Sequence, residues 1–159
     1  MKRRVLFLCA TNSLYSPMAE ALLRLIDSRN FEAYSAGVSC HPMHPLTIEV
    51  MKEIGIDLGL KTPRLVAEVR DEAFDFVITL DEIAASQQDQ VTAVETVHWK
   101  FDNPLAASDN PEMQRRQFRT VRDQMARRLR LFAIVHVRQG IAERNLVVPG
   151  PSNPAIQVQ

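Results

Sequence analysis

Cysteine is scarce in this sequence, whose 159 residues include only Cys9 and Cys40. Two thiols are too few for a disulfide scaffold or for a zinc site built from four cysteines. Neither sign of charge is in excess, because Lys plus Arg and Asp plus Glu each number 19. This balance disfavours nucleic acid as a partner. We therefore expect a cytoplasmic protein with free thiols and no bound cofactor.

Long apolar runs are also missing from the start of the chain. The run from Val5 to Ala10 is too short to cross a membrane or to form the apolar part of a signal peptide, and polar residues follow it. We expect no membrane partner. With 46% apolar and 24% charged residues, the chain has the composition and length of one globular domain.

Strand and helix patterns alternate along the chain. The apolar run over residues 5–8 is typical of a strand buried on both faces of a parallel sheet. Ser16-Pro17 then predicts a helix that begins at Pro17 behind a Ser cap. Further strands are predicted over 31–36, 74–80 and 91–99, and further helices over 48–54, 81–90 and 112–138. This order predicts an α/β domain over residues 1–140, followed by a poorly ordered tail over 141–159.

The turn between the first strand and the first helix, Cys9 to Ser16, is the main candidate for chemistry. In parallel α/β folds ligands bind at the carboxyl ends of the strands. Backbone N–H groups and the helix dipole at such a turn favour an oxyanion, and they would also favour the thiolate form of Cys9. The alternative is that Cys9 is simply a small buried residue at the end of an apolar strand.

The residues around this turn resemble the low-molecular-weight protein tyrosine phosphatase superfamily, which includes the thioredoxin-coupled arsenate reductases. The resemblance starts with Cys9, Asn12-Ser13, Ser16 and Met18-Ala19-Glu20. It continues through 35–37, 48–56, 74–80, 98–102 and 118–123. It implies a four-stranded parallel sheet flanked by helices, flavodoxin-like, with a phosphate-binding loop between the first strand and the first helix.

The resemblance also implies roles for individual residues. Cys9 takes the position of the nucleophile, and Asn12 and Ser16 take positions that shape the loop and assist the thiolate. Where the family has its general-acid Asp before Pro, this chain has Asn103, with Asp102 one residue earlier. The residues expected to contact substrate are Ala10, Thr11, Ser13, Leu14, Tyr15 and Trp99.

Besides Asn103, two positions depart from the family pattern. Tyr15 stands where the family has its oxyanion-clamping Arg, and Thr11 stands at a loop glycine position. An Arg of this kind is worth roughly 10³–10⁵ in rate and a general acid roughly 10²–10⁴. We therefore predict a weak or impaired phosphatase that would act through a cysteinyl-phosphate on Cys9. Two questions stay open: whether Tyr15 fills the anion space or lies on the surface, and whether Thr11 adopts a strained backbone with positive φ.

Two other functions are alternatives. The first is a non-catalytic regulatory module that binds an oxyanion, a phosphoprotein or another acidic partner. The second is arsenate reduction by an atypical thiol route. The usual route needs further cysteines after the third strand, but residues 80–84 contain none, and Cys40 is the one other thiol. Cys40 either pairs with Cys9 or is an unpaired loop cysteine, which we favour.

Two further features have plain structural interpretations. Cys40, His41 and His44 lie close in sequence, but they lack a carboxylate at recognisable spacing, so we favour surface or capping roles over a metal site. The predicted last helix is rich in arginine, which we interpret as a solvated face rather than as a docking surface. These arginines are Arg115, Arg116, Arg119, Arg122, Arg127, Arg128 and Arg130.

Overall fold

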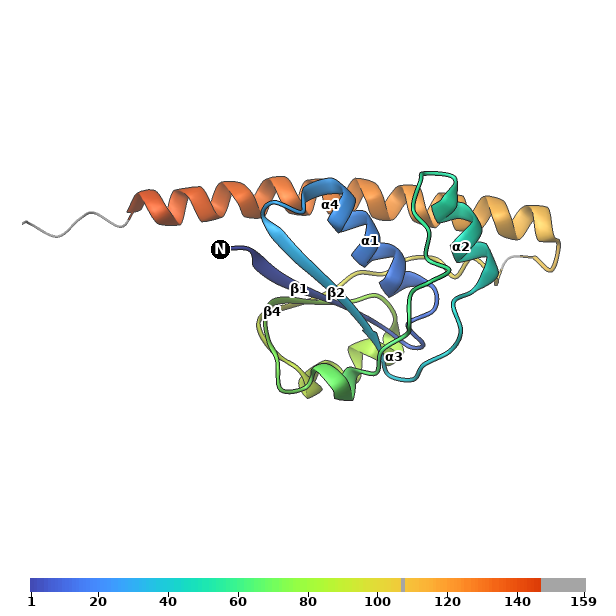
Figure 1. Ribbon diagram of the computed structural model, residues 1–159, viewed down its shortest axis with the longest axis horizontal. Coiled ribbons are helices and arrows are strands. Elements are labelled where there is room, and N and C mark those ends of the chain that lie inside the picture. The colour runs from blue at the N-terminus through green and yellow to red at the C-terminus, as the bar shows by residue number, and fades with distance from the viewer. Residues whose placement is uncertain (107, 147–159) are drawn as a thin grey trace, which may run out of the picture.

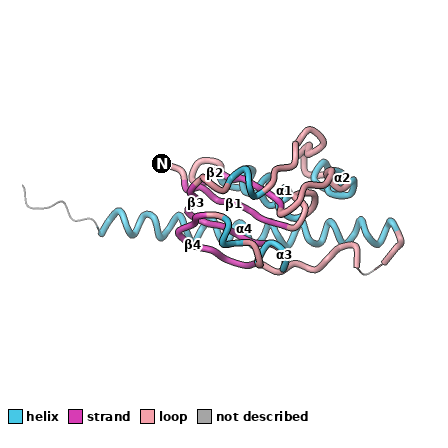
Figure 2. Tube along the Cα trace, turned by 90° about the horizontal axis from the view of Figure 1, so that it is seen from below, coloured by secondary structure: helices cyan, strands magenta, loops and turns pink. Residues whose placement is uncertain are grey.

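A parallel sheet forms the centre of the molecule, in a computed structural model that describes residues 1–106 and 108–146. Its strands are β1 (Arg3–Cys9), β2 (Phe31–Gly37), β3 (Ala73–Thr79) and β4 (Thr92–His98). They lie in the order β2-β1-β3-β4 (Figure 2), and every pairing is parallel. The predicted four-stranded parallel sheet is therefore confirmed.

Helices cover the sheet on both faces. The α-helices are α1 (Tyr15–Asp27), α2 (Pro45–Lys52), α3 (Glu82–Ala85) and α4 (Pro111–Leu146), and short 3-10 helices cover Val66–Val69 and Gln88–Gln90. Figure 1 shows α1 and α2 beside the long α4, with α3 at the opposite side of the sheet. None of the described helices combines the length and apolar character needed to cross a lipid bilayer.

The central position of β1 explains its continuous apolar sequence. Successive side chains of a strand point to opposite faces of the sheet. Val5, Phe7 and Cys9 pack into the larger core with α1, α2 and α4, whereas Leu6 and Leu8 pack into the smaller one on the other face. The alternation therefore directs the Cys9 side chain toward the helical layer that begins with α1.

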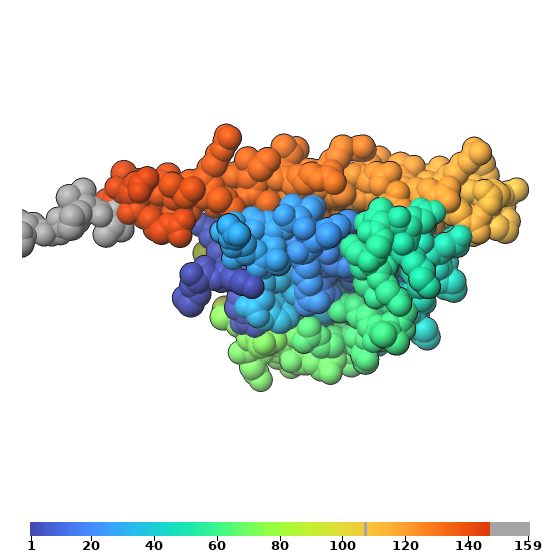
Figure 3. Space-filling view, turned by 45° about the horizontal axis from the view of Figure 1, so that its top comes forward, coloured from blue at the N-terminus to red at the C-terminus, as the bar shows by residue number. Residues whose placement is uncertain are grey.

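Helix α4 is longer than the sequence predicted. We expected it to end near Arg138, but it continues through Gly140 to Leu146 and forms a ridge that extends past the body of the domain (Figure 3). A glycine ends a helix when it adopts positive φ, and Gly140 does not. Residues 141–146, which we assigned to the tail, are therefore part of α4, and residues 147–159 lie outside the described part.

The predicted helix over 81–90 is interrupted. It consists of α3 and the 3-10 turn Gln88–Gln90. The Ser86 hydroxyl donates a hydrogen bond to the Ile83 carbonyl at 2.7 Å, a local bond that competes with continued helix.

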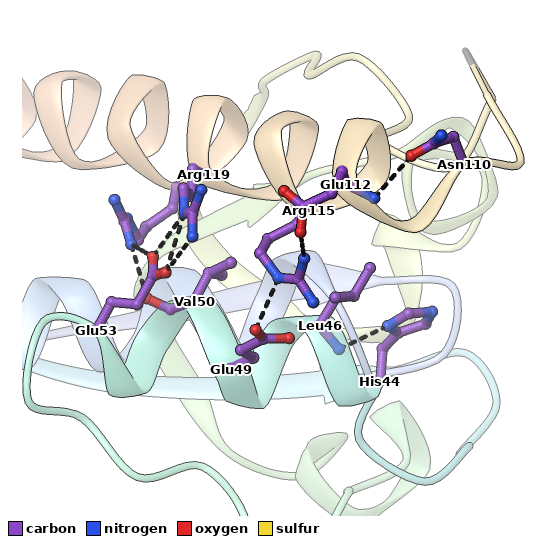
Figure 4. A network of polar contacts seen from close by, with 10 residues as sticks. His44, Leu46, Glu49, Val50, Glu53, Asn110, Glu112, Arg115 and Arg119 are labelled. Carbon is purple, nitrogen blue, oxygen red and sulfur yellow. Dashed lines mark hydrogen bonds and ion pairs between the residues drawn. The ribbon is translucent and has the colours of Figure 1, made fainter.

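Arginines of α4 hold α2 in place. Arg119 and Arg122 both pair with Glu53, at 2.7 Å and 2.8 Å, and Arg115 pairs with Glu49 (Figure 4). Arg122 also donates to the Val50 carbonyl. The interpretation of a purely solvated arginine face is therefore wrong for this half of the helix, because α2 supplies the matching carboxylates.

Candidate active site

The loop after β1 is fixed from outside by a second loop, which follows β2. The N–H groups of Val38, Ser39, His41 and His44 donate to the carbonyls of Cys9, Ala10, Thr11 and Ser13, over 2.8–3.1 Å. Gly37 permits this close approach, because a Cβ there would lie 2.6 Å from the Asn12 nitrogen. These bonds turn the carbonyl groups of the first loop toward the second loop.

The N–H groups of the same loop are left available. Within the described residues, the N–H groups of Thr11, Asn12, Ser13 and Leu14 have no hydrogen-bond acceptor. Asn12 has φ of 51°, and a left-handed residue within such a turn can gather successive N–H groups into an anion-binding concavity. The strained residue considered at Thr11 does not occur, because the left-handed position falls on Asn12, a residue type that tolerates it.

Polar side chains link Cys9 to the interior. The Sγ of Cys9 lies 2.9 Å from the Ser16 Oγ, and the Asn12 amide donates to Ser16 at 2.8 Å and to Ser35 at 3.0 Å. Ser35 in turn donates to the buried carboxylate of Glu20. Lys61 and Arg24 neutralise that carboxylate, at 2.5 Å and 2.7 Å. The structure therefore brings together three of the predicted catalytic residues: Cys9, Asn12 and Ser16.

Ser16 does not cap α1, as the Ser-Pro pattern suggested. The helix begins two residues earlier than predicted, at Tyr15, behind Leu14, which makes no side-chain capping bond. The Ser16 hydroxyl instead forms hydrogen bonds with the Cys9 sulfur and the Asn12 amide inside the loop.

Tyr15 crosses the mouth of the site. Its hydroxyl donates to the Asp102 carbonyl at 3.1 Å, and its ring stacks on Phe101 with centroids 6.5 Å apart. Burial, followed by the negative charges of Asp81, Cys9 and Asp102, raises the pKa of Tyr15 to about 12. Tyr15 therefore neither fills the anion space nor lies free on the surface, because its side chain joins the first loop to the 101–103 segment. Its raised pKa also keeps the phenol neutral.

The two residues at the general-acid position face different cavities. Asn103 lines the cavity of Cys9, whereas Asp102 lines a neighbouring one between the 100–102 segment and α4. The side-chain oxygen of Asn103 accepts from the Leu105 N–H at 3.0 Å and fixes a local turn. Of these two residues, the one that shares the cavity of the thiol thus has an amide, which cannot donate a proton as a carboxylic acid does.

A cavity of about 560 Å³ surrounds the thiol side of the loop. It brings together Cys9, Ala10, Thr11, Ser13, Leu14, Tyr15 and Asn103 from the prediction. It also contains residues that were not predicted to contact substrate: His41, His44, Leu80, Asp81, Glu82, Ile83, His98, Lys100, Phe101 and Leu105. Most of these follow β2, β3 and β4, so their position at the carboxyl ends of the strands was the available signal.

The carboxylate of Asp81 accepts a hydrogen bond from one of the loop amides. It accepts from the Ala10 N–H at 2.7 Å and from the Ala84 N–H at 2.8 Å, and the second bond caps α3. The anion concavity therefore starts at Thr11 and has a negative charge at its edge.

Three other residues considered in the sequence have positions that argue against a direct part in the thiol chemistry. Trp99 is buried in the core against Phe132 and under the Arg128 guanidinium and does not line the cavity, so its assignment to substrate binding does not fit its position. His44 caps α2 by accepting from Leu46, as expected of a capping histidine, and burial lowers its pKa. Cys40 is exposed and unpaired, whereas Cys9 is buried.

Among the described residues, no group of three or more His, Cys, Asp or Glu side chains is placed to hold a metal ion.

Fold and site together define an α/β protein whose first loop holds a cysteine among backbone amides. The family model of the low molecular weight phosphotyrosine protein phosphatases matches residues 4–144. The chain therefore belongs to that family, and the resemblance in the sequence is confirmed.

Individual relatives carry two kinds of names. An arsenate reductase of Halalkalibacterium halodurans is 35% identical over 133 residues, which are 83% of this chain and 96% of that protein. A structure of an arsenate reductase in the phosphate binding state is 28% identical, with a TM-score of 0.68, and the match covers 83% of this chain and 96% of the other. A mutant of the arginine phosphatase YwlE with a phosphorylated active site serine is 26% identical, with a TM-score of 0.62, over 82% and 93%.

Proposed function

We propose that the loop from Cys9 to Ser16 binds phosphate or a related tetrahedral oxyanion, and that the chain hydrolyses phosphate monoesters slowly through Cys9. The observation that carries the proposal is the row of four backbone N–H groups, from Thr11 to Leu14, that lack a hydrogen-bond acceptor in the described part of the chain. The thiol of Cys9 lies in the same loop, within hydrogen-bond distance of the Ser16 hydroxyl. Backbone N–H groups are strong hydrogen-bond donors, and a ligand with several acceptor oxygens can satisfy four neighbouring ones at once.

The reaction has two steps. The Cys9 thiolate attacks phosphorus, the bond to the ester oxygen breaks, and the leaving alcohol takes its proton from water. Water then attacks the cysteinyl-phosphate, inorganic phosphate leaves, and the thiolate is restored. The Ser16 hydroxyl, bonded to the sulfur, stabilises the thiolate as the leaving group of the second step.

Both missing groups slow the first step. Tyr15 is neutral and cannot match the charge of a phosphoryl group as a guanidinium does, and Asn103 cannot protonate the leaving oxygen. Groups that act as a unit are not additive, so the loss is smaller than the product of the two factors.

The test is turnover of para-nitrophenyl phosphate with Cys9→Ser as the matched variant. The proposal expects slow turnover by the natural chain, none by Cys9→Ser, and a phosphoryl group on Cys9 in intact-mass spectra of the quenched reaction. Turnover that persists in Cys9→Ser would overturn the assignment of the nucleophile. Oxyanion binding without any turnover would overturn the hydrolysis and leave a non-catalytic oxyanion- or phosphoprotein-binding module.

Arsenate reduction is a second candidate, favoured by the names of the relatives. The Cys9 thiolate would attack arsenic and displace one arsenate oxygen, which leaves as water after protonation. A small thiol such as glutathione would then attack the Cys9 sulfur, so that the S–As bond breaks, arsenite leaves with the electron pair, and a mixed disulfide remains on Cys9. The route must be atypical, because Cys40 is the one other thiol of the chain. A mixed disulfide on Cys9 after treatment with arsenate and glutathione is expected, and its absence would remove this candidate. Both functions need a reduced thiol, which supports a cytoplasmic location.

A further inference from the structure

Lys100 lies in the wall of the Cys9 cavity. It follows β4 by two residues, at the edge of the sheet where β1 also ends. It lies between two cavities, because it lines both the cavity of Cys9 and the neighbouring one that Asp102 lines. Among the described residues that form the cavity of Cys9, it is the one Lys or Arg. Within the described part of the chain it has no ion pair, so its ammonium group is available to a ligand.

The other ionisable groups of the cavity are engaged or ill suited to balance a dianion. The Nδ1 of His98 lies 2.8 Å from the Thr79 hydroxyl and its Nε2 lies 3.4 Å from Glu82. His44 caps α2 through its ring nitrogen. A lysine carries a full charge across the neutral range, whereas an ordinary imidazole is mostly neutral there.

We propose that the ammonium group of Lys100 supplies the positive charge for a tetrahedral dianion beside Cys9, a role for which Tyr15 is unsuited. The inference rests on the proposed oxyanion site. A lysine is a flexible point charge rather than a planar fork, so it neutralises the anion without clamping two of its oxygens. The expected ligand is thus a doubly charged tetrahedral oxyanion, held by loop amides on one side and by Lys100 on the other.

The test is calorimetric titration with tungstate, a tetrahedral dianion, at low and at physiological salt. The variants are Lys100→Met, which removes the charge, Lys100→Arg, which keeps it, and Lys52→Met as the matched control on the exposed surface of α2. We expect Lys100→Met to weaken binding about 10-fold, the scale of one charge-assisted hydrogen bond, and to flatten the salt dependence. Lys100→Arg and Lys52→Met should bind within about three-fold of the natural chain, a difference below 1 kcal/mol.

The outcomes separate this inference from the function on which it rests. Equal tungstate affinity of the natural chain and Lys100→Met would overturn the role of Lys100 and leave the oxyanion site standing. A natural chain that binds no tungstate would overturn the oxyanion site itself. Thermal unfolding of each variant shows whether a weaker affinity comes from a damaged fold, and a Lys100→Met midpoint equal to that of the natural chain is required for support.

Discussion

The sulfur of Cys9 lies 2.9 Å from the hydroxyl oxygen of Ser16, and that oxygen accepts a hydrogen bond from the Asn12 amide. Because the amide occupies a lone pair of the hydroxyl, the hydroxyl proton is directed toward the sulfur or toward the Ala36 carbonyl, which lies at a longer 3.4 Å. The Ser16 hydroxyl is therefore placed within hydrogen-bond distance of the sulfur that we propose as the nucleophile.

Ser16→Ala should lower turnover of para-nitrophenyl phosphate about 10-fold, because a hydrogen bond to a charged group is worth about 1.5 kcal/mol or more. Ser86→Ala, at the exposed end of α3, is the control for a serine outside the site. Equal turnover of Ser16→Ala and the natural chain would show that the 2.9 Å contact does not serve the chemistry.

We expect the slow turnover that we propose to be reversible by restoring the family residues. We expect Tyr15→Arg/Asn103→Asp to raise turnover by at least about 10²-fold, since the missing groups are each worth roughly that or more elsewhere. Tyr15→Met separates the added charge from simple loss of the ring and should give no comparable gain. If the double variant is no faster than the natural chain, the missing Arg and Asp are not the reason for weak activity.

Asn12 combines a left-handed backbone with a buried, fully bonded amide. Asn12→Ala loses both, so we expect it to lower the free energy of unfolding by about 2–4 kcal/mol. Asn12→Gly loses only the side chain and should be about 1 kcal/mol more stable than Asn12→Ala. Urea denaturation measures both variants, and the reverse order would contradict the assigned role of the backbone.

The contact between α2 and α4 makes part of the stability dependent on pH. The hydrogen bond from Arg119 is the main cause that lowers the pKa of Glu53. A carboxyl whose pKa is lowered by folding stabilises the protein above its ordinary pKa, and this contribution is lost as the pH falls through that range. The pair is partly exposed, so we expect at most about 1 kcal/mol.

Glu53→Gln should therefore lower stability at pH 7 and converge with the natural chain near pH 3, as measured by denaturant unfolding across that range. Glu95→Gln, on the edge strand β4, is the control for loss of an exposed carboxylate. A Glu53→Gln deficit that is constant with pH would show that charge is not the source of the effect.

The sequence was sufficient for the sheet and for the centre of the site, because both depend on local patterns. The apolar run of β1 needs burial on two faces, and the turn that follows it fixes Cys9, Asn12 and Ser16 within eight residues. The rest of the cavity wall depends on tertiary placement. Asp81 and Lys100 reach the site only because β3 and β4 end at the same edge of the sheet.

Two predictions failed for the same kind of reason. Glycine and Ser-Pro are helix-ending and helix-starting signals in isolation, but neither signal decides the helix bounds at Gly140 or at Ser16-Pro17. Helix α4 continues through Gly140 without the left-handed backbone of a terminating glycine, and the Ser16 hydroxyl is bonded within the loop. The direction of Tyr15 likewise depends on Phe101 and Asp102, more than 80 residues away along the chain.

The central claim is that the loop amides, rather than an arginine, hold the anion. Amide proton and nitrogen chemical shifts of Thr11 to Leu14, followed by NMR during titration with tungstate, test it most directly. We predict large, saturable shifts at these four residues and little change at the arginines of α4. Saturable binding that leaves the four amides unshifted would contradict the account.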